Sequence, residues 1–210
     1  KLGLEFSALE KPSFDDRFRD RLLNFIRASE IDAACLLAQE AVYKDDGTVW
    51  EDAGNAFVPN DYVLRLARDY KEFIPAVSIH PARPDAIEEL HRCLDLGAAM
   101  MKCLPNCQNI NCNDSKFKPF WNRMAEAGLP LLAHTGGEHT LQVVNADYAN
   151  PETLRLAAEQ GLGRTFADIL MPVEGAWRAE LPVHALMKLL RRAPGKQWRW
   201  PSGTYPAVGR

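Results

Sequence analysis

The chain of 210 residues lacks several features that would place a protein in a class at once. No stretch approaches the roughly 18 to 20 consecutive apolar residues of a membrane-spanning helix. The first ten residues have neither the basic flank nor the apolar run of a secretory signal peptide. These absences predict a cytoplasmic protein without a membrane partner.

A large excess of one charge is also lacking, because 25 Lys and Arg residues stand against 28 Asp and Glu residues, a net charge of −3. A nearly neutral chain has no general attraction for a phosphate backbone, so we predict no nucleic-acid partner. No glycine-rich GxGxxG or GxxxxGK[ST] motif follows an apolar run. This absence argues against an open sheet that binds nucleotides.

Cysteine is scarce and odd in number, with five residues, three of which lie in apolar segments (Cys35, Cys93 and Cys103). That usage is typical of a reducing compartment and predicts free thiols. Cys103, Cys107 and Cys112 have the spacing C-x3-C-x4-C. This spacing matches neither a C-x2-C zinc pair nor the usual iron–sulfur patterns, so we predict no thiolate-bound metal.

Short apolar runs alternate with segments of helical periodicity along the first 160 residues. Parallel strands need crossover connections and are buried on both faces, so the pattern predicts a parallel sheet covered by helices, either a barrel or an open doubly wound sheet. The predicted strands lie at residues 31–38, 73–79, 98–104 and 129–133, and the predicted helices begin near residues 15, 59, 84, 117 and 151.

Polar side chains gather where each predicted strand ends, and the carboxyl ends of parallel strands meet at one rim. Imidazole, carboxylate and amine groups at a shared rim are typical of a metal site or a general acid–base site. The glycine pair 136–137 lets the chain turn sharply after His134. The candidates are Gln39, Glu40, His80, Lys102, Asn106, Gln108, Asn109, His134, Glu138 and His139.

Several of these residues also have a structural interpretation. A single His at a strand end, such as His80, is more often hydrogen-bonded structure than a ligand, and His91 lies on a charged helix face. Lys102 could be an exposed position of an edge strand. Asn and Gln in a loop often cap their own backbone. His134, directly after a continuous apolar run, is the best-placed histidine.

The segment MMKCLPNCQNI, followed by a helix and then GLPLLAHTGGEHT, resembles the amidohydrolase-related family of metal-dependent hydrolases. The likeness covers about residues 15–160. The family has a (β/α)8 TIM-barrel fold and holds a divalent metal, usually zinc. Its ligands are an H-x-H pair on strand one, a His ending strand five, often a His ending strand six, and an Asp ending strand eight. Some members add a carboxylated Lys from strand four that bridges two metals.

The resemblance implies that His134 is the strand-five metal ligand and that Lys102 occupies the strand-four position. Lys102 would then be a carboxylated bridging ligand or a positive charge that orients an anionic substrate, and Glu138 and His139 would orient His134. The implied cofactor is one or two divalent ions, zinc or manganese. No H-x-H pair occurs in the 210 residues, and we do not expect His184, within a helical pattern, to be a ligand.

From these features we predict an α/β fold, an incomplete (β/α)8 barrel of four to five units at residues 1–160. Residues 161–210 form a basic segment that we could not align to the family, as a truncated or rearranged chain would give. They carry eight Lys or Arg and three acidic residues, a net charge of +5, against −8 for residues 1–160. An open barrel leaves strand edges unpaired, so we expect copies to associate or the chain to belong to a larger whole.

Three functions stay open at this point. The first is hydrolysis of a C–N or C–O bond in a small-molecule amide, ester or lactone by a metal-activated water, with Lys102 and Glu138 as catalytic groups. The second is metal-dependent decarboxylation on the same scaffold. The third is an inactive fragment that acts as a binding or assembly module.

Overall fold

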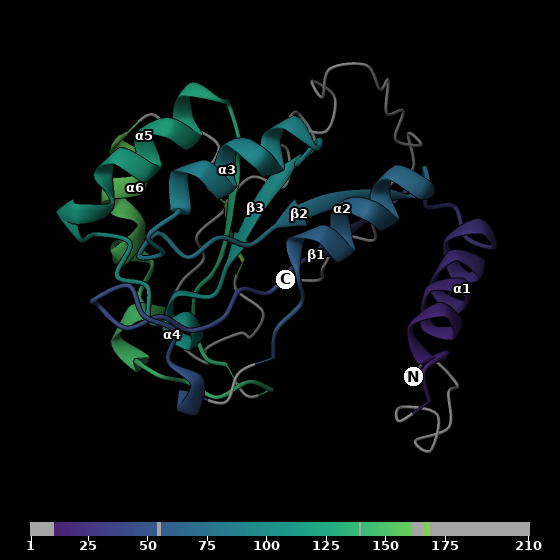
Figure 1. Ribbon diagram of the computed structural model, residues 1–210, viewed down its shortest axis with the longest axis horizontal. Coiled ribbons are helices and arrows are strands. Elements are labelled where there is room, and N and C mark those ends of the chain that lie inside the picture. The colour runs from purple at the N-terminus through teal and green to yellow at the C-terminus, as the bar shows by residue number, and fades with distance from the viewer. Residues whose placement is uncertain (1–10, 54–55, 139, 161–165, 169–210) are drawn as a thin grey trace, which may run out of the picture. The chain divides into compact units, whose positions relative to one another are not determined.

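The computed structural model describes residues 11–53, 56–138 and 140–160 and the backbone of residues 166–168. Helices and strands alternate along this part of the chain (Figure 1). The strands are β1 (Ala34–Leu37), β2 (Phe73–Val77), β3 (Met100–Cys103), β4 (Leu131–His134) and β5 (Phe166–Asp168). The α-helices are α1 (Phe14–Arg27), α2 (Asn60–Asp69), α3 (Ala86–Asp95), α4 (Pro105–Gln108), α5 (Lys118–Glu126) and α6 (Arg155–Glu159). Short 3-10 helices are η2 (Glu51–Ala53), η3 (Ser115–Phe117), η4 (Ala146–Ala149) and η5 (Pro151–Leu154).

The five strands form one sheet in the order β1-β2-β3-β4-β5. Each strand pairs in parallel with the next strand along the chain. A doubly wound sheet reverses its strand order at a switch point, whereas a β/α barrel keeps chain order around the ring. The order therefore resolves the choice that the sequence left open, and the prediction of an incomplete (β/α) barrel is confirmed.

The sheet continues past residue 160, because β5 pairs with β4 through residues 166–168. The boundary that we drew between residues 1–160 and 161–210 stays a prediction, since most of the second segment lies outside the described residues. His139 and His184 lie outside them as well.

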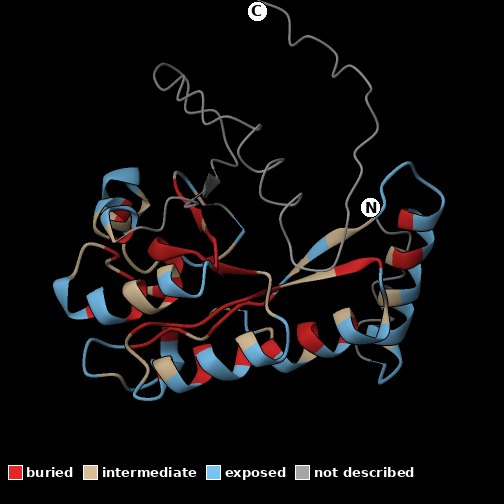
Figure 2. Ribbon diagram, turned by 90° about the horizontal axis from the view of Figure 1, so that it is seen from above, coloured by how far each residue is buried: buried red, intermediate tan, exposed pale blue. Residues whose placement is uncertain are grey.

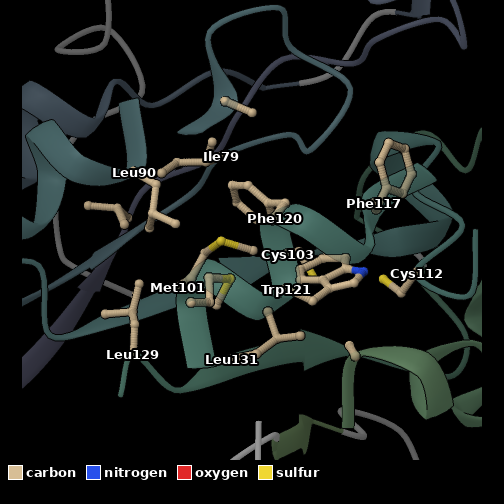
Figure 3. Packing of buried hydrophobic residues seen from close by; sticks show 14 of the residues in the cluster. Ile79, Leu90, Met101, Cys103, Cys112, Phe117, Phe120, Trp121, Leu129 and Leu131 are labelled. Carbon is tan, nitrogen blue, oxygen red and sulfur yellow. The ribbon is translucent and has the colours of Figure 1, made fainter. Parts of the chain in front are cut away.

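The main core lies between one face of the sheet and helices α3, α5 and α6 (Figure 3). Alternate residues of β3 and β4 supply the sheet side, and the apolar stripes that the sequence predicted for the helices supply the other. Gly97 and Gly128 follow α3 and α5 with φ of +93° and +65°, a conformation that favours glycine, so both helices end where expected. Core members include Val77, Leu90, Cys93, Met101, Cys103, Phe120, Trp121, Met124, Leu131, Ala133 and Ala157.

Strand β1 is less covered than its neighbour β2 (Figure 2). One face packs in a smaller cluster that contains Leu23 and Ile26 of α1, Leu66 of α2 and Phe73 of β2. On the other face Leu37 is 42% exposed. The association of copies through strand edges stays an expectation.

All five cysteines are free thiols, as predicted. Cys103, Cys107 and Cys112 are buried, as is Cys93. Among the described helices, none combines the length and the apolar character needed to cross a membrane.

Candidate active site at the carboxyl ends of the strands

The register of β3 and β4 places Lys102 and His134 on the same face of the sheet. Met101 is level with Leu131 and Lys102 with Leu132. Side chains alternate between faces along a strand, and Met101 and Leu131 pack against the helices. Lys102 and His134 therefore belong to the face turned away from the helices. They are 4% and 1% exposed.

Lys102 lies on an interior strand, since β3 pairs with β2 and with β4. The interpretation of Lys102 as an exposed edge position is therefore wrong. Burying an ammonium group is expensive unless the surroundings compensate it, and such groups gather at functional sites.

The two ring nitrogens of His134 have different surroundings. Nε2 lies 3.4 Å from the carbonyl oxygen of Gly137 and 3.6 Å from Oε2 of Glu138. Nδ1 is buried and has no hydrogen-bond partner within the described part of the chain. A buried imidazole nitrogen without a partner is costly, so its position suggests a ligand.

A tight turn brings Glu138 back to His134. Gly136 has φ of +106°, which lets the chain reverse directly after the strand. Oε1 of Glu138 accepts hydrogen bonds from the hydroxyl of Thr140 at 2.6 Å and the amide of Leu141 at 3.2 Å. The Glu138 side chain is 7% exposed. The turn thus fixes Oε1 of Glu138, while Oε2 lies near the imidazole of His134.

The loop after β4 is tied to helix α4, which follows β3. The backbone carbonyl of Asn106 accepts hydrogen bonds from the amides of Val144 and Asn145, each at 2.9 Å. Burial, with the negative charge of Glu138 as a second cause, raises the pKa of Cys107 to about 11. Asn106 and Cys107 therefore belong to the surroundings of the His134–Glu138 pair, and Asn106 was among the rim candidates that the sequence offered.

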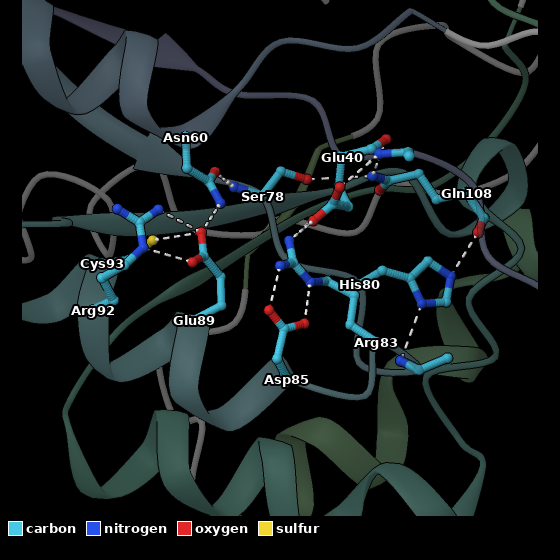
Figure 4. Close-up of polar contacts among 12 residues, drawn as sticks. Glu40, Asn60, Ser78, His80, Arg83, Asp85, Glu89, Arg92, Cys93 and Gln108 are labelled. Carbon is cyan, nitrogen blue, oxygen red and sulfur yellow. Dashed lines mark hydrogen bonds and ion pairs between the residues drawn. The ribbon is translucent and has the colours of Figure 1, made fainter. Parts of the chain in front are cut away.

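His80, at the end of β2, is held by backbone groups on both ring nitrogens (Figure 4). Nδ1 accepts from the amide of Ala82 at 3.1 Å, so Nε2 carries the proton that it donates to the carbonyl of Gln108 at 2.8 Å. Burial lowers the pKa of His80 to about 4. The ring is thus neutral and both of its nitrogens are hydrogen-bonded, which favours the structural interpretation.

The Gln108 side chain joins three loops, a role that no sequence pattern indicates. Its Oε1 accepts from the amide of Leu104 at 2.6 Å. Its Nε2 donates to the carbonyl of Glu40 and to the hydroxyl of Ser78, each at 3.2 Å. The segments after β1, β2 and β3 are therefore fixed to one another beneath the rim.

A pocket of about 180 Å³ lies elsewhere, beside the first turns of α2 and α3. Its ionic groups satisfy one another (Figure 4): Arg83 pairs with Glu40 and Asp85, and Arg92 pairs with Glu89. Because these charges are neutralised, we place the candidate site at His134. The pocket is lined by Glu40, Phe57, Val58, Pro59, Asn60, Asp61, Ser78, Arg83, Glu89 and Arg92.

The described residues contain no group of three or more His, Cys, Asp or Glu side chains arranged to hold a metal. They do contain the imidazole of His134, whose Nδ1 is buried and unpartnered in the described structure. Its other nitrogen, Nε2, lies near the carboxylate of Glu138. These residues fit one ligand of a metal centre with the carboxylate that usually supports it. His91 is remote from this arrangement, since it is exposed and accepts a hydrogen bond from Arg123.

A solved structure with a TM-score above 0.5 supports the barrel fold. A solved TIM-barrel protein from Bordetella bronchiseptica, described as uncharacterized, is 19% identical, with a TM-score of 0.54 over 92% of this chain and 61% of its own. An amidohydrolase from Mycobacterium avium subsp. paratuberculosis K-10 is 19% identical, with a TM-score of 0.41 over 76% of this chain and 47% of its own. The chain thus spans about 61% of the first structure. No curated protein matches it.

A family profile described as amidohydrolase matches residues 13–191. The match covers most of the chain and runs past residue 160, where we ended the resemblance. The strand order of the sheet agrees with the family profile. The chain belongs to the amidohydrolase family.

Proposed function

We propose that the chain serves the metal-dependent hydrolysis of a C–N or C–O bond in a small molecule such as an amide, ester or lactone. The observation that carries the proposal is the buried Nδ1 of His134, which has no partner in the described structure. A metal-binding imidazole uses one nitrogen for the metal and directs the other toward a carboxylate or a carbonyl. His134 already has this division, because Nε2 faces Gly137 and Glu138.

His134 would hold a divalent metal, which we propose to be zinc, with manganese as the alternative. Such a metal lowers the pKa of a bound water toward neutrality and polarises a carbonyl group. Glu138 would orient the His134 ring and exchange a proton with the reacting groups. Lys102, on the same face of the sheet, would be a carboxylated ligand or a cation that orients an anionic substrate. Catalytic zinc sites use three protein ligands, so the proposal requires ligands beyond His134.

We further propose a small-molecule substrate, no nucleic-acid partner and a cytoplasmic location. The net charge of −3 and the five free thiols support these expectations.

Metal content and turnover of the full chain test the proposal. The chain would be loaded with zinc or manganese, dialysed, analysed for bound metal, and assayed on a panel of amides, esters and lactones. We expect one or two bound ions, their loss in His134→Ala, and their retention in His91→Ala, a matched exposed histidine. Release of carbon dioxide would favour decarboxylation. A chain that binds no metal and turns nothing over would overturn the proposal in favour of a non-catalytic module.

A further inference from the structure

Buried polar atoms without partners are concentrated at the rim of the sheet. Five side-chain atoms of this kind occur among the described residues, and only Trp121 Nε1 belongs to the main core. The other four are Gln39 Nε2, Asn106 Oδ1, His134 Nδ1 and Thr135 Oγ1. His134 ends β4, and the other three follow the carboxyl ends of β1, β3 and β4. Native proteins leave few such atoms unsatisfied, so their concentration at one edge calls for a ligand there.

Three of these atoms share one kind of chemistry. Nδ1 of His134, Oδ1 of Asn106 and Oγ1 of Thr135 can each present a lone pair, whereas an amide Nε2 and an indole Nε1 can only donate. A set of lone pairs in a buried place suits an electropositive ligand or one rich in hydrogen-bond donors. A divalent cation with its bound waters is both.

These three residues lie at the carboxyl ends of two neighbouring strands, β3 and β4. Thr135 directly follows His134 in the chain. Cys103 is level with Ala133, the residue before His134, and Asn106 lies three residues after Cys103. Its backbone carbonyl is fixed by two amides of the loop that leaves β4. Asn106 and Thr135 are 1% and 0% exposed.

We propose that Asn106 and Thr135 are positioning residues of the metal site, whose oxygen atoms accept hydrogen bonds from the waters bound to a cation on His134. The inference rests on the proposed function for the metal itself. Zinc in proteins prefers nitrogen, sulfur and carboxylate ligands, so a neutral carboxamide and a hydroxyl act through water instead. As acceptors, they fix which way the protons of a bound water are directed.

Isosteric substitution of the full chain tests this inference. Thr135→Val and Asn106→Leu remove the unpartnered oxygen while keeping the shape of the side chain. Without metal, Thr135→Val should melt about 2 °C or more above the parent chain, because a costly buried group is gone. Zn²⁺ titration by calorimetry should show binding about tenfold weaker than in the parent. A purely structural residue would give a lower melting temperature and unchanged affinity.

Two controls separate the causes. Trp121→Phe removes an unpartnered atom away from the rim, so Zn²⁺ affinity should stay within twofold of the parent. Thr135→Ser keeps the hydroxyl and should restore affinity. Unchanged Zn²⁺ affinity in both Thr135→Val and Asn106→Leu, with loss in His134→Ala, would overturn this inference alone. A parent chain that binds no Zn²⁺ would overturn both this inference and the proposed function.

Discussion

The carboxyl ends of β2 and β4 each carry a histidine that is 1% exposed, but the two regions use that histidine in opposite ways. After β2, both nitrogens of His80 bond to backbone groups, the amide of Ala82 and the carbonyl of Gln108. After β4, Nδ1 of His134 has no partner in the described chain, and the nearest acceptor of Nε2 is a long 3.4 Å away.

The surroundings differ in the same way. Near β2 the charges are matched, as in the 2.7 Å pair of Arg83 with Glu40. Near β4 Asn106 and Thr135 add further buried oxygen atoms without partners. A strand-end position therefore does not identify a ligand by itself. What separates a structural histidine from a candidate ligand is whether each of its ring nitrogens is satisfied.

The largest expected effect comes from removing each histidine in turn. His134→Ala should lower kcat/KM about 100-fold or more, roughly 3 kcal/mol of transition-state stabilisation, because the proposed metal ligand is lost. Its melting temperature should fall less than that of His80→Ala, since Nδ1 of His134 has no partner to lose in the described structure. His80→Ala should lower the melting temperature by several degrees. Steady-state kinetics and calorimetry measure both, and a stable His80→Ala variant without activity would contradict the comparison.

Acid should destabilise the fold through His80. Its pKa is about 4 in the folded chain, below the ordinary 6.5, so the unfolded chain binds the proton first as pH falls. The contribution of His80 is complete above pH 6.5 and is lost as pH falls toward 4, by about 3 kcal/mol in total.

Urea unfolding at several pH values measures this loss. His80→Gln, which cannot titrate, should show a flatter dependence of unfolding free energy between pH 6.5 and 4. An equally steep dependence in that variant would assign the effect to other groups.

Periodicity in the sequence located the longer elements because their apolar patterns depend only on local geometry. The run at residues 98–104 contains β3 at Met100–Cys103, and the stripe at residues 84–97 contains α3 at Ala86–Asp95. Helix α4 and strand β5 were missed as elements, since four and three residues are too few to show a period. Strand order also has no local signature, so the prediction of a barrel depended on the family resemblance and not on periodicity.

The candidate site also contains features that the sequence indicates and features that only the fold shows. His134, Lys102 and Glu138 were found because strand-end chemistry and a glycine turn are visible in sequence. A hydrogen-bonded role was expected for His80, but its partner in the backbone of Gln108 was not visible, because it lies 28 positions away. The unpartnered oxygen of Thr135 was not visible either, since burial and missing partners are tertiary properties.

A smaller effect is expected at the two rim glutamines. Gln108→Ala should lower the unfolding free energy by about 2 kcal/mol, because the amide of Leu104 and the carbonyl of Glu40 lose a buried partner. Gln39→Ala should cost clearly less, since the Nε2 of Gln39 has no partner in the described structure. Urea denaturation of both variants measures the difference. Equal losses would show that the hydrogen bonds of Gln108 add nothing beyond side-chain packing.

The smallest effect is expected at the carboxylate beside His134. Glu138→Gln keeps the size of the side chain but removes the charge that lies 3.6 Å from Nε2. Zn²⁺ affinity should fall about tenfold, or about 1.4 kcal/mol, because a carboxylate partner increases the basicity of a metal-binding imidazole. Zn²⁺ titration by calorimetry, with the melting temperature of each metal-free variant, measures the change.

Glu126→Gln is the matched control for this substitution, because Glu126 is exposed and pairs with Arg123 on α5. It should leave Zn²⁺ affinity unchanged. If Glu138→Gln lowers the melting temperature but not the affinity, Glu138 only stabilises the turn through Thr140 and Leu141. The rim after β4 would then resemble the rim after β2, with its polar groups serving structure alone, and the contrast between the two histidines would rest on Nδ1 of His134.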